Sequence, residues 1–89
     1  MSKAIKQAIK ELQVELIKKL IKTYTNEGDF ILDPFMGSGV TGEACVHLNR
    51  SFTGIEMDNN YFNKAKERIE NAKQHIRESS RPSNEIRRV

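Results

Sequence analysis

The sequence predicts an α/β fold in which a helix, a strand, a second helix, a second strand and a third helix follow one another. Two short apolar runs indicate the strands: residues 29–33, "DFILD", which have the form of a strand buried on both faces, and residues 52–56. The segment between them has helical spacing. Because a strand–helix–strand passage of this length joins parallel strands by a right-handed crossover, two parallel strands are expected.

Composition narrows the class of protein. The 89 residues are 37% hydrophobic and 30% charged, which is typical of one soluble globular unit with a modest core. No run approaches the roughly 18 apolar residues of a membrane span, and the single cysteine fits a reducing cytoplasm. Fifteen basic residues against twelve acidic ones give a net charge of +3, which permits a nucleic-acid partner without arguing for one.

Residues 1–24 are predicted to form the first helix, because apolar residues recur there at steps of three or four. Lysines occupy the positions between them and are interpreted as a solvated face, with a DNA-binding face as the alternative. The apolar stripe consists of Ile5, Ile9, Leu12, Leu16, Leu20 and Tyr24.

The second and third helices are predicted over residues 40–48 and from Asp58 onward, and Asp58 or Asn59 can cap the third. Residues 79–89 have lost the pattern and are expected to be a loose tail, so that the domain itself covers residues 1–78. The apolar stripes of these two helices are Val40, Ala44 and Leu48, then Tyr61, Ala65, Ile69, Ala72 and Ile76.

A glycine-rich turn, "DPFMGSGVTG" at residues 33–42, joins the end of the first strand to the second helix. Ligands bind at this end of the strands in open α/β sheets. Gly37 and Gly39 let the backbone turn sharply and lie close to a ligand, and the first N–H groups of the helix attract negative charge. The turn is therefore interpreted as an anion-binding site.

The neighbouring residues indicate which ligand the turn suits. "GSGVTG" satisfies the G-x-G-x-x-G pattern but lacks the Lys and Ser or Thr of a phosphate-binding loop. Glu56 follows at the end of the second strand, about 20 residues on, where a carboxylate can accept hydrogen bonds from both hydroxyls of a ribose. A ribose-bearing nucleotide is implied. The structural alternative is a tight connection and a solvated acidic residue.

Two longer stretches, "DPFMGSGVTGEAC" and "NRSFTGIEMDNNYFNKAKERI", resemble the cofactor-binding part of the DNA amino-methyltransferases. These enzymes methylate adenine N6 or cytosine N4 and are common in restriction–modification systems and phages. The preceding "VELIKKLIKTYTNEGDFILD" looks like the segment that leads into the motif, so the resemblance covers residues 14–69. It implies a partial Rossmann-like methyltransferase fold and S-adenosylmethionine in place of a dinucleotide.

The resemblance also implies roles for individual residues. The glycine turn surrounds the methionine moiety, with Asp33 facing the ammonium group; Glu56 holds the ribose hydroxyls and Met57 packs against adenine. No catalytic residue is assigned, and no metal site, since Cys45 is interpreted as a core residue and His47 and His75 stand apart. The implied cofactor-binding residues are Asp33, Pro34, Phe35, Gly37, Ser38, Gly39, Thr41, Glu56 and Met57.

The chain departs from the family where catalysis is concerned. The Asp or Asn, Pro, Pro and aromatic residues that hold the target amine in these enzymes have no counterpart here, and some thirty residues precede Asp33. Leu12 and Gln13 also replace a usual Lys–Pro pair, and Val40 replaces a usual Thr. The expected function is that of an S-adenosylmethionine-binding fragment of a DNA adenine-N6 methyltransferase, with weak cofactor binding and no activity alone.

The predicted two-stranded sheet has uncovered edges, so a partner is expected. That partner is a second copy or a complementary methyltransferase chain, and DNA is reached only through it. Adenine is preferred over cytosine only by overall family resemblance. The alternative functions are a non-catalytic interaction or regulatory module and a decayed reading frame, both derived from a methyltransferase.

Overall fold

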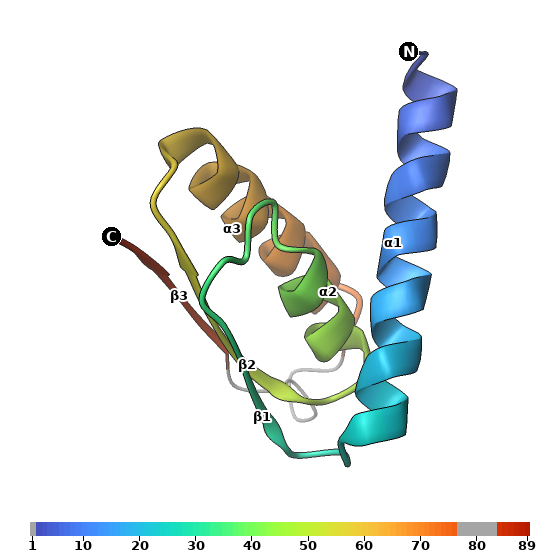
Figure 1. Ribbon diagram of the computed structural model, residues 1–89, viewed down its shortest axis with the longest axis vertical. Coiled ribbons are helices and arrows are strands. Elements are labelled where there is room, and N and C mark those ends of the chain that lie inside the picture. The colour runs from blue at the N-terminus through green and yellow to red at the C-terminus, as the bar shows by residue number, and fades with distance from the viewer. Residues whose placement is uncertain (1, 77–83) are drawn as a thin grey trace.

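The computed structural model describes residues 2–76 and 84–89, which form three helices and one parallel sheet. The sheet has the strand order β1-β2-β3, and all three helices lie on one side of it (Figure 1). The predicted α/β class and the parallel pairing of the first two strands are confirmed. In chain order the elements are α1 (Lys3–Tyr24), β1 (Phe30–Asp33), α2 (Val40–His47), β2 (Ser51–Glu56), α3 (Asn59–Lys73) and β3 (Asn84–Arg88).

The C-terminal residues differ from the prediction of a loose tail and of only two strands. Residues 84–88 form β3, which pairs with β2 in parallel. Ile86 packs against the core, whereas Glu85 and Arg87 are exposed and form an ion pair at 2.7 Å. An edge strand covered on one face needs only one apolar residue, so no apolar run marked it. The predicted boundary after residue 78 lies outside the described residues.

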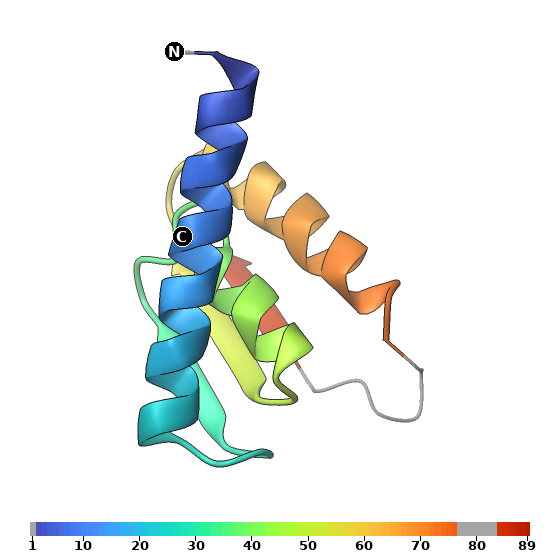
Figure 2. The same cartoon turned by 90° about the vertical axis from the view of Figure 1, so that its right-hand side faces the viewer.

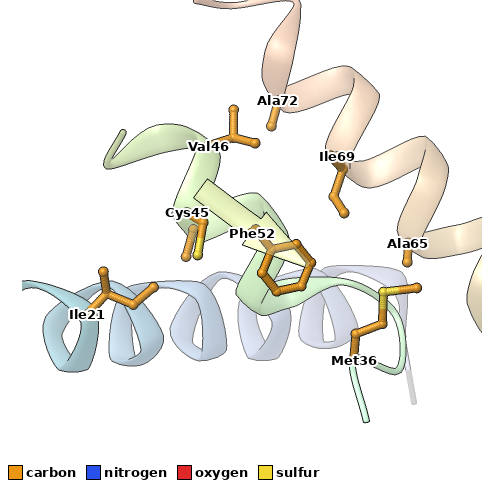
Figure 3. Close-up of a cluster of buried hydrophobic side chains, with 9 residues drawn as sticks. Ile21, Met36, Cys45, Val46, Phe52, Ala65, Ile69 and Ala72 are labelled. Carbon is orange, nitrogen blue, oxygen red and sulfur yellow. The ribbon is translucent and has the colours of Figure 1, made fainter. Parts of the chain in front are cut away.

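The core lies between the sheet and the helical layer. Phe52 of β2 is 1% exposed and sits among side chains from α2 and α3 (Figure 3). Cys45 is fully buried, as predicted, and burial raises the pKa of its thiol to about 12, so the thiol is neutral at physiological pH. The buried cluster consists of Ile21, Met36, Ala44, Cys45, Val46, Phe52, Ala65, Ile69 and Ala72.

Helix α1 packs against α2 through a different face from the predicted one. Val14 and Ile21 are buried, and Ile17 packs beside them. Leu12 is two positions from Val14, which places it about 200° around the helix, so it points the other way. Apolar residues occur on both sides of α1, and spacing alone does not say which side meets the core. The predicted stripe is exposed at Ile5, Ile9, Leu12, Leu16, Leu20 and Tyr24.

Strand β1 is covered on one face only, in contrast to the strand buried on both faces that its apolar run predicts. Ile31 packs against the core, whereas Phe30 is 64% exposed and Leu32 is 57% exposed. The reason is the placement of the helical layer on one side of the sheet (Figure 2). None of the described helices combines the length and the apolar character that a membrane crossing needs.

A buried arginine links the end of α1 to the turn between α2 and β2. Arg50 is 6% exposed, and its guanidinium donates to the Leu48 carbonyl at 2.7 Å. The same group donates to the carbonyl and the hydroxyl of Thr25, at 2.9 Å and 3.1 Å. Because Thr25 precedes β1 by a short turn and Arg50 directly precedes β2, these bonds tie together the two segments that lead into the strands.

Replacing Arg50 by methionine is expected to lower the free energy of unfolding by about 2–4 kcal/mol. Methionine keeps the apolar stem but leaves two carbonyls and a hydroxyl without their charged donor, at about 1.5–3 kcal/mol for each such bond when bonds are lost singly. Urea denaturation followed by circular dichroism measures the change. Arg87→Met is the control, because Arg87 is exposed and makes one ion pair, so its loss should cost about 0.5 kcal/mol or less. Equal stability of the two variants would contradict the proposed role of Arg50.

Candidate cofactor-binding site

The glycine turn runs from the last residue of β1 to the first turn of α2. Gly37 and Gly39 adopt positive φ angles of 54° and 88°, and Gly39 is the N-cap residue of α2. The N–H of Met36 donates to the Ile55 carbonyl at 3.1 Å, which ties the turn to β2. The N–H groups of residues 40–42 have no partner within the helix, as at any helix start, so they are donors for an anion.

Glu56 lies against this turn from the end of β2. Its Oε1 accepts a hydrogen bond from the Gly37 N–H at 2.9 Å, and its Oε2 accepts one from the Asp58 N–H at 2.9 Å. From the sequence, Glu56 was expected near the turn only because it ends a strand. The structure shows that its carboxylate is hydrogen-bonded to the turn itself. The carboxylate is thus a structural link as well as a candidate ligand-binding group.

Asp33 occupies the C-terminal end of β1 beside Gly54 of β2. Its Oδ1 accepts a hydrogen bond from the Phe35 N–H at 3.0 Å, and the side chain is half-buried. No bond of Oδ2 is found within residues 2–76 and 84–89, so this oxygen can accept from a cationic group at the same edge of the sheet. Asp33 and Glu56 therefore present two carboxylates at the C-terminal ends of neighbouring strands.

The apolar members of the predicted set lie in the open. Phe35 is 87% exposed and Met57 is 72% exposed, and Pro34 is exposed as well. Phe35 follows the end of β1 by two residues, and Met57 directly follows β2. Large apolar side chains at this edge are available to contact a ligand, since the core does not use them.

Helix α3 supports the turn from the other side. A methyl group added at Gly39 would lie 2.8 Å from the Cα and Cβ of Ala65, so the two backbones approach closely. Arg68 donates to the Ser38 hydroxyl at 3.4 Å and pairs with Glu43 of α2 at 3.2 Å. Sequence reasoning missed Arg68; the available signal was its position three residues after Ala65, on the same face of α3.

Ser38 and Thr41, the remaining polar members of the predicted set, are half-buried at the start of α2. Asp58 caps α3, as predicted, because its Oδ1 accepts a hydrogen bond from the Tyr61 N–H at 2.9 Å. Within the described part of the chain, no three His, Cys, Asp or Glu side chains gather closely enough to hold a metal ion.

A hollow of about 700 Å³ opens between the helices and away from the strand ends. Ser38 is the one member of the predicted set among its lining residues, and its walls mix basic and acidic side chains such as Lys10, Glu43 and Arg68. The candidate cofactor site is therefore defined by the hydrogen bonds of the turn and not by this hollow.

Comparisons with known proteins agree with the motif. A family model described as DNA methylase matches residues 6–67. The type II methyltransferase M.HpaI of Haemophilus parainfluenzae is 47% identical over 55 residues, which are 62% of this chain and 18% of that protein. M2.DpnII of Streptococcus pneumoniae is 46% identical over 55 residues, which are 62% of this chain and 20% of that protein. The chain thus spans a small part of the length of these relatives.

Solved structures show the same relation. M1.HpyAVI, crystallised as a complex with SAM, superimposes with a TM-score of 0.62 at 52% identity, over 63% of this chain and 28% of that one. YjhP from E. coli superimposes with a TM-score of 0.62 at 23% identity, over 86% of this chain and 29% of that one. The latter likeness concerns the fold alone.

Proposed function

This chain belongs to the DNA methylase family, and from that premise we propose that it binds S-adenosylmethionine and forms the cofactor-binding part of a site-specific DNA adenine-N6 methyltransferase. The observation that carries the proposal is the hydrogen bond from the Gly37 N–H to Glu56. It unites the glycine turn and the acidic residue at the C-terminal ends of adjacent parallel strands, where α/β sheets bind ligands. The SAM complex of M1.HpyAVI supports the choice of cofactor.

The residues at this edge fit the groups of S-adenosylmethionine. The N–H groups at the start of α2 suit its carboxylate, and the Asp33 side chain suits its ammonium group. Each oxygen of Glu56 uses one lone pair in the bonds described above, so further acceptor capacity is left for two ribose hydroxyls. When bound there, the cofactor supplies an electrophilic methyl group.

Phe35 and Met57 would cover the apolar parts of the same ligand. Both are now mostly exposed, and fully burying a side chain of this size stabilises a complex by about 1.5–3 kcal/mol. In this arrangement Met57 packs against the adenine ring and Phe35 closes the methionine side.

Catalysis requires residues that this chain does not contain. Methyl transfer to an exocyclic amine needs a group that holds the flipped base in line with the methyl donor. The 89 residues include no polar–Pro–Pro–aromatic sequence for this task. We assign that role, and the contacts with DNA, to a complementary methyltransferase part. A second copy would cover apolar surface but would bring the same residues again. Adenine is preferred over cytosine by family resemblance alone.

One observation favours a second candidate function, that of a non-catalytic interaction module derived from a methyltransferase. The exposed stripe of α1, from Ile5 to Leu20, is an apolar surface that the described residues leave uncovered. In that case the chain acts through protein contacts, and the cofactor site keeps its backbone conformation without binding a cofactor.

Calorimetric titration with S-adenosylmethionine tests the cofactor proposal. Binding is expected to be weak, because the chain offers an open edge and not an enclosed pocket. Glu56→Ala should lower the affinity about 10-fold to 100-fold, which corresponds to the loss of about 1.5–3 kcal/mol for hydrogen bonds to a charged group. Glu67→Ala, on the exposed side of α3, is the control and should bind as the natural chain does.

A 2′-deoxyribose analogue of the cofactor separates direct contact from support of the turn. If Glu56 binds the ribose, the natural chain should bind the analogue less tightly, and the Glu56→Ala variant should not distinguish the two ligands. Unchanged discrimination in the variant would show that Glu56 acts only by holding the turn. Binding that survives Glu56→Ala would place the ribose elsewhere.

A further inference from the structure

Helix α2 carries a negative charge close to the end that is proposed to receive the cofactor carboxylate. Glu43 lies in its first turn, and the Glu43 N–H donates to the carbonyl of the N-cap residue Gly39 at 2.9 Å. Four helical residues rise about 6 Å, which is less than the Debye length of about 8 Å in physiological salt. The Glu43 carboxylate, left uncompensated, would therefore repel an anion at the start of α2.

The neighbouring helix α3 supplies the opposite charge. Helices α2 and α3 lie side by side (Figure 2), and Nε of Arg68 lies 3.2 Å from Oε1 of Glu43. The two side chains are 16% and 23% exposed, so salt screens this pair less than a pair at the surface. His47 lies 3.7 Å from Oε2 of Glu43 and is charged only when protonated, whereas Arg68 is always charged. Arg68 is therefore the permanent cation beside Glu43.

We infer that Arg68 is a positioning residue for the cofactor: by neutralising Glu43, it keeps the start of α2 attractive to the carboxylate of S-adenosylmethionine. This inference rests on the proposed function. The effect passes through Glu43 and requires no contact between Arg68 and the ligand. The same guanidinium donates to the Ser38 hydroxyl at 3.4 Å, so it is held beside the glycine turn as well as beside Glu43.

A purely structural role for Arg68 predicts different behaviour. If Arg68 only holds α3 against the glycine turn, its loss loosens the turn and weakens every ligand of the site alike. Removal of the Glu43 charge would then repair nothing, because the ion pair stays broken. Charge compensation instead predicts that only a ligand with a carboxylate is weakened. It also predicts that binding recovers once Glu43 is made neutral.

The test compares S-adenosylmethionine with its decarboxylated form, which keeps the ammonium group, the sulfonium and the adenosine but lacks the carboxylate. Calorimetric titration measures the affinity of the natural chain and of each variant for both ligands. Arg68→Gln should lower the affinity for S-adenosylmethionine about threefold to tenfold, the scale on which one charge acts at a helix N-terminus. Its affinity for the decarboxylated form should not fall, since an unpaired Glu43 attracts a cationic ligand.

Three further variants complete the comparison. The double variant Glu43→Gln, Arg68→Gln should bind S-adenosylmethionine to within about twofold of the natural chain. Glu43→Gln alone should bind it at least as tightly as the natural chain, because the Arg68 charge is then unopposed. Lys73→Gln is the control: it removes one charge and the ion pair with Glu70 from the last turn of α3, and it should leave both affinities unchanged.

The inference is overturned if Arg68→Gln binds S-adenosylmethionine as the natural chain does, or if it weakens both ligands equally. Failure of the double variant to recover, or a loss of affinity in Glu43→Gln alone, would also overturn it. Circular dichroism checks that each variant folds, and Glu43→Gln keeps the bond between Arg68 and Ser38. In all these cases the natural chain still binds S-adenosylmethionine, so the proposed function stands. A natural chain that binds neither ligand would contradict the proposed function itself.

Discussion

Gly39→Ala is expected to lower the free energy of unfolding by about 2–5 kcal/mol, a large part of the roughly 5–15 kcal/mol that stabilises a small domain. Two causes add. Alanine at a φ of 88° costs about 1–2 kcal/mol, and its methyl group would lie 2.8 Å from the backbone of Ala65, which costs a further 1–3 kcal/mol through overpacking. Urea denaturation measures the loss, and S-adenosylmethionine binding should fall with it.

Gly28→Ala is a matched control for the first cause. Gly28 has a φ of 87°, and an added methyl group there meets no atom within 4 Å. Its substitution should therefore cost only the conformational term, about 1–2 kcal/mol. The difference between the two variants is the cost of separating α3 from the glycine turn. If both variants lose the same stability, Ala65 does not hold the turn in place.

The chain alone is expected to transfer no methyl group to DNA. Positioning of the two reactants supplies about 7–11 kcal/mol of the barrier reduction in such reactions, so its loss lowers the rate by about 10⁵-fold or more. The assay incubates the purified chain with labelled S-adenosylmethionine and mixed-sequence DNA, and it counts the label in the DNA. Intact M.HpaI under the same conditions is the positive control.

Methyl transfer by the chain alone would contradict this prediction, provided that the Gly37→Asp substitution abolishes the transfer. A Cβ added at Gly37 meets no atom within 4 Å, and Asp tolerates a φ of 54°, so this variant should fold. It would place a third carboxylate at the site and repel the cofactor carboxylate. Label that disappears in the variant would therefore come from this site and not from a contaminating enzyme.

Local signals were sufficient for the central part of the fold. The apolar runs predicted β1 and β2, and the glycine pattern followed by Glu56 predicted which two segments meet, because parallel strands bring their C-terminal ends to one edge. β3 was not predicted, because only one of its faces is covered and Ile86 alone fills that face. A single apolar residue among polar ones gives no strand pattern. The packed face of α1 was missed because two apolar faces compete, and only the position of α2 decides between them.

Contacts between distant side chains could not be predicted. Arg50 is one of fifteen basic residues, and nothing in its neighbourhood marks it as buried against the carbonyl groups of Leu48 and Thr25. Arg68 likewise reads as a surface residue of an amphipathic helix, although it reaches Ser38 and Glu43. Such roles depend on the relative placement of whole elements, which residue spacing does not specify.

The parallel sheet also determines how the chain folds. Phe30 pairs with Ser51, and Phe52 pairs with Asn84. The backbone hydrogen bonds of each strand pair can therefore form only after the long intervening segment has closed into a loop. Loop-closure entropy is lost before any sheet bond is gained, which slows folding relative to a helical bundle of this length. During that interval the apolar residues of β1 are available to other unfolded chains. Yield on refolding should therefore fall steeply as protein concentration rises, even where the native state is stable.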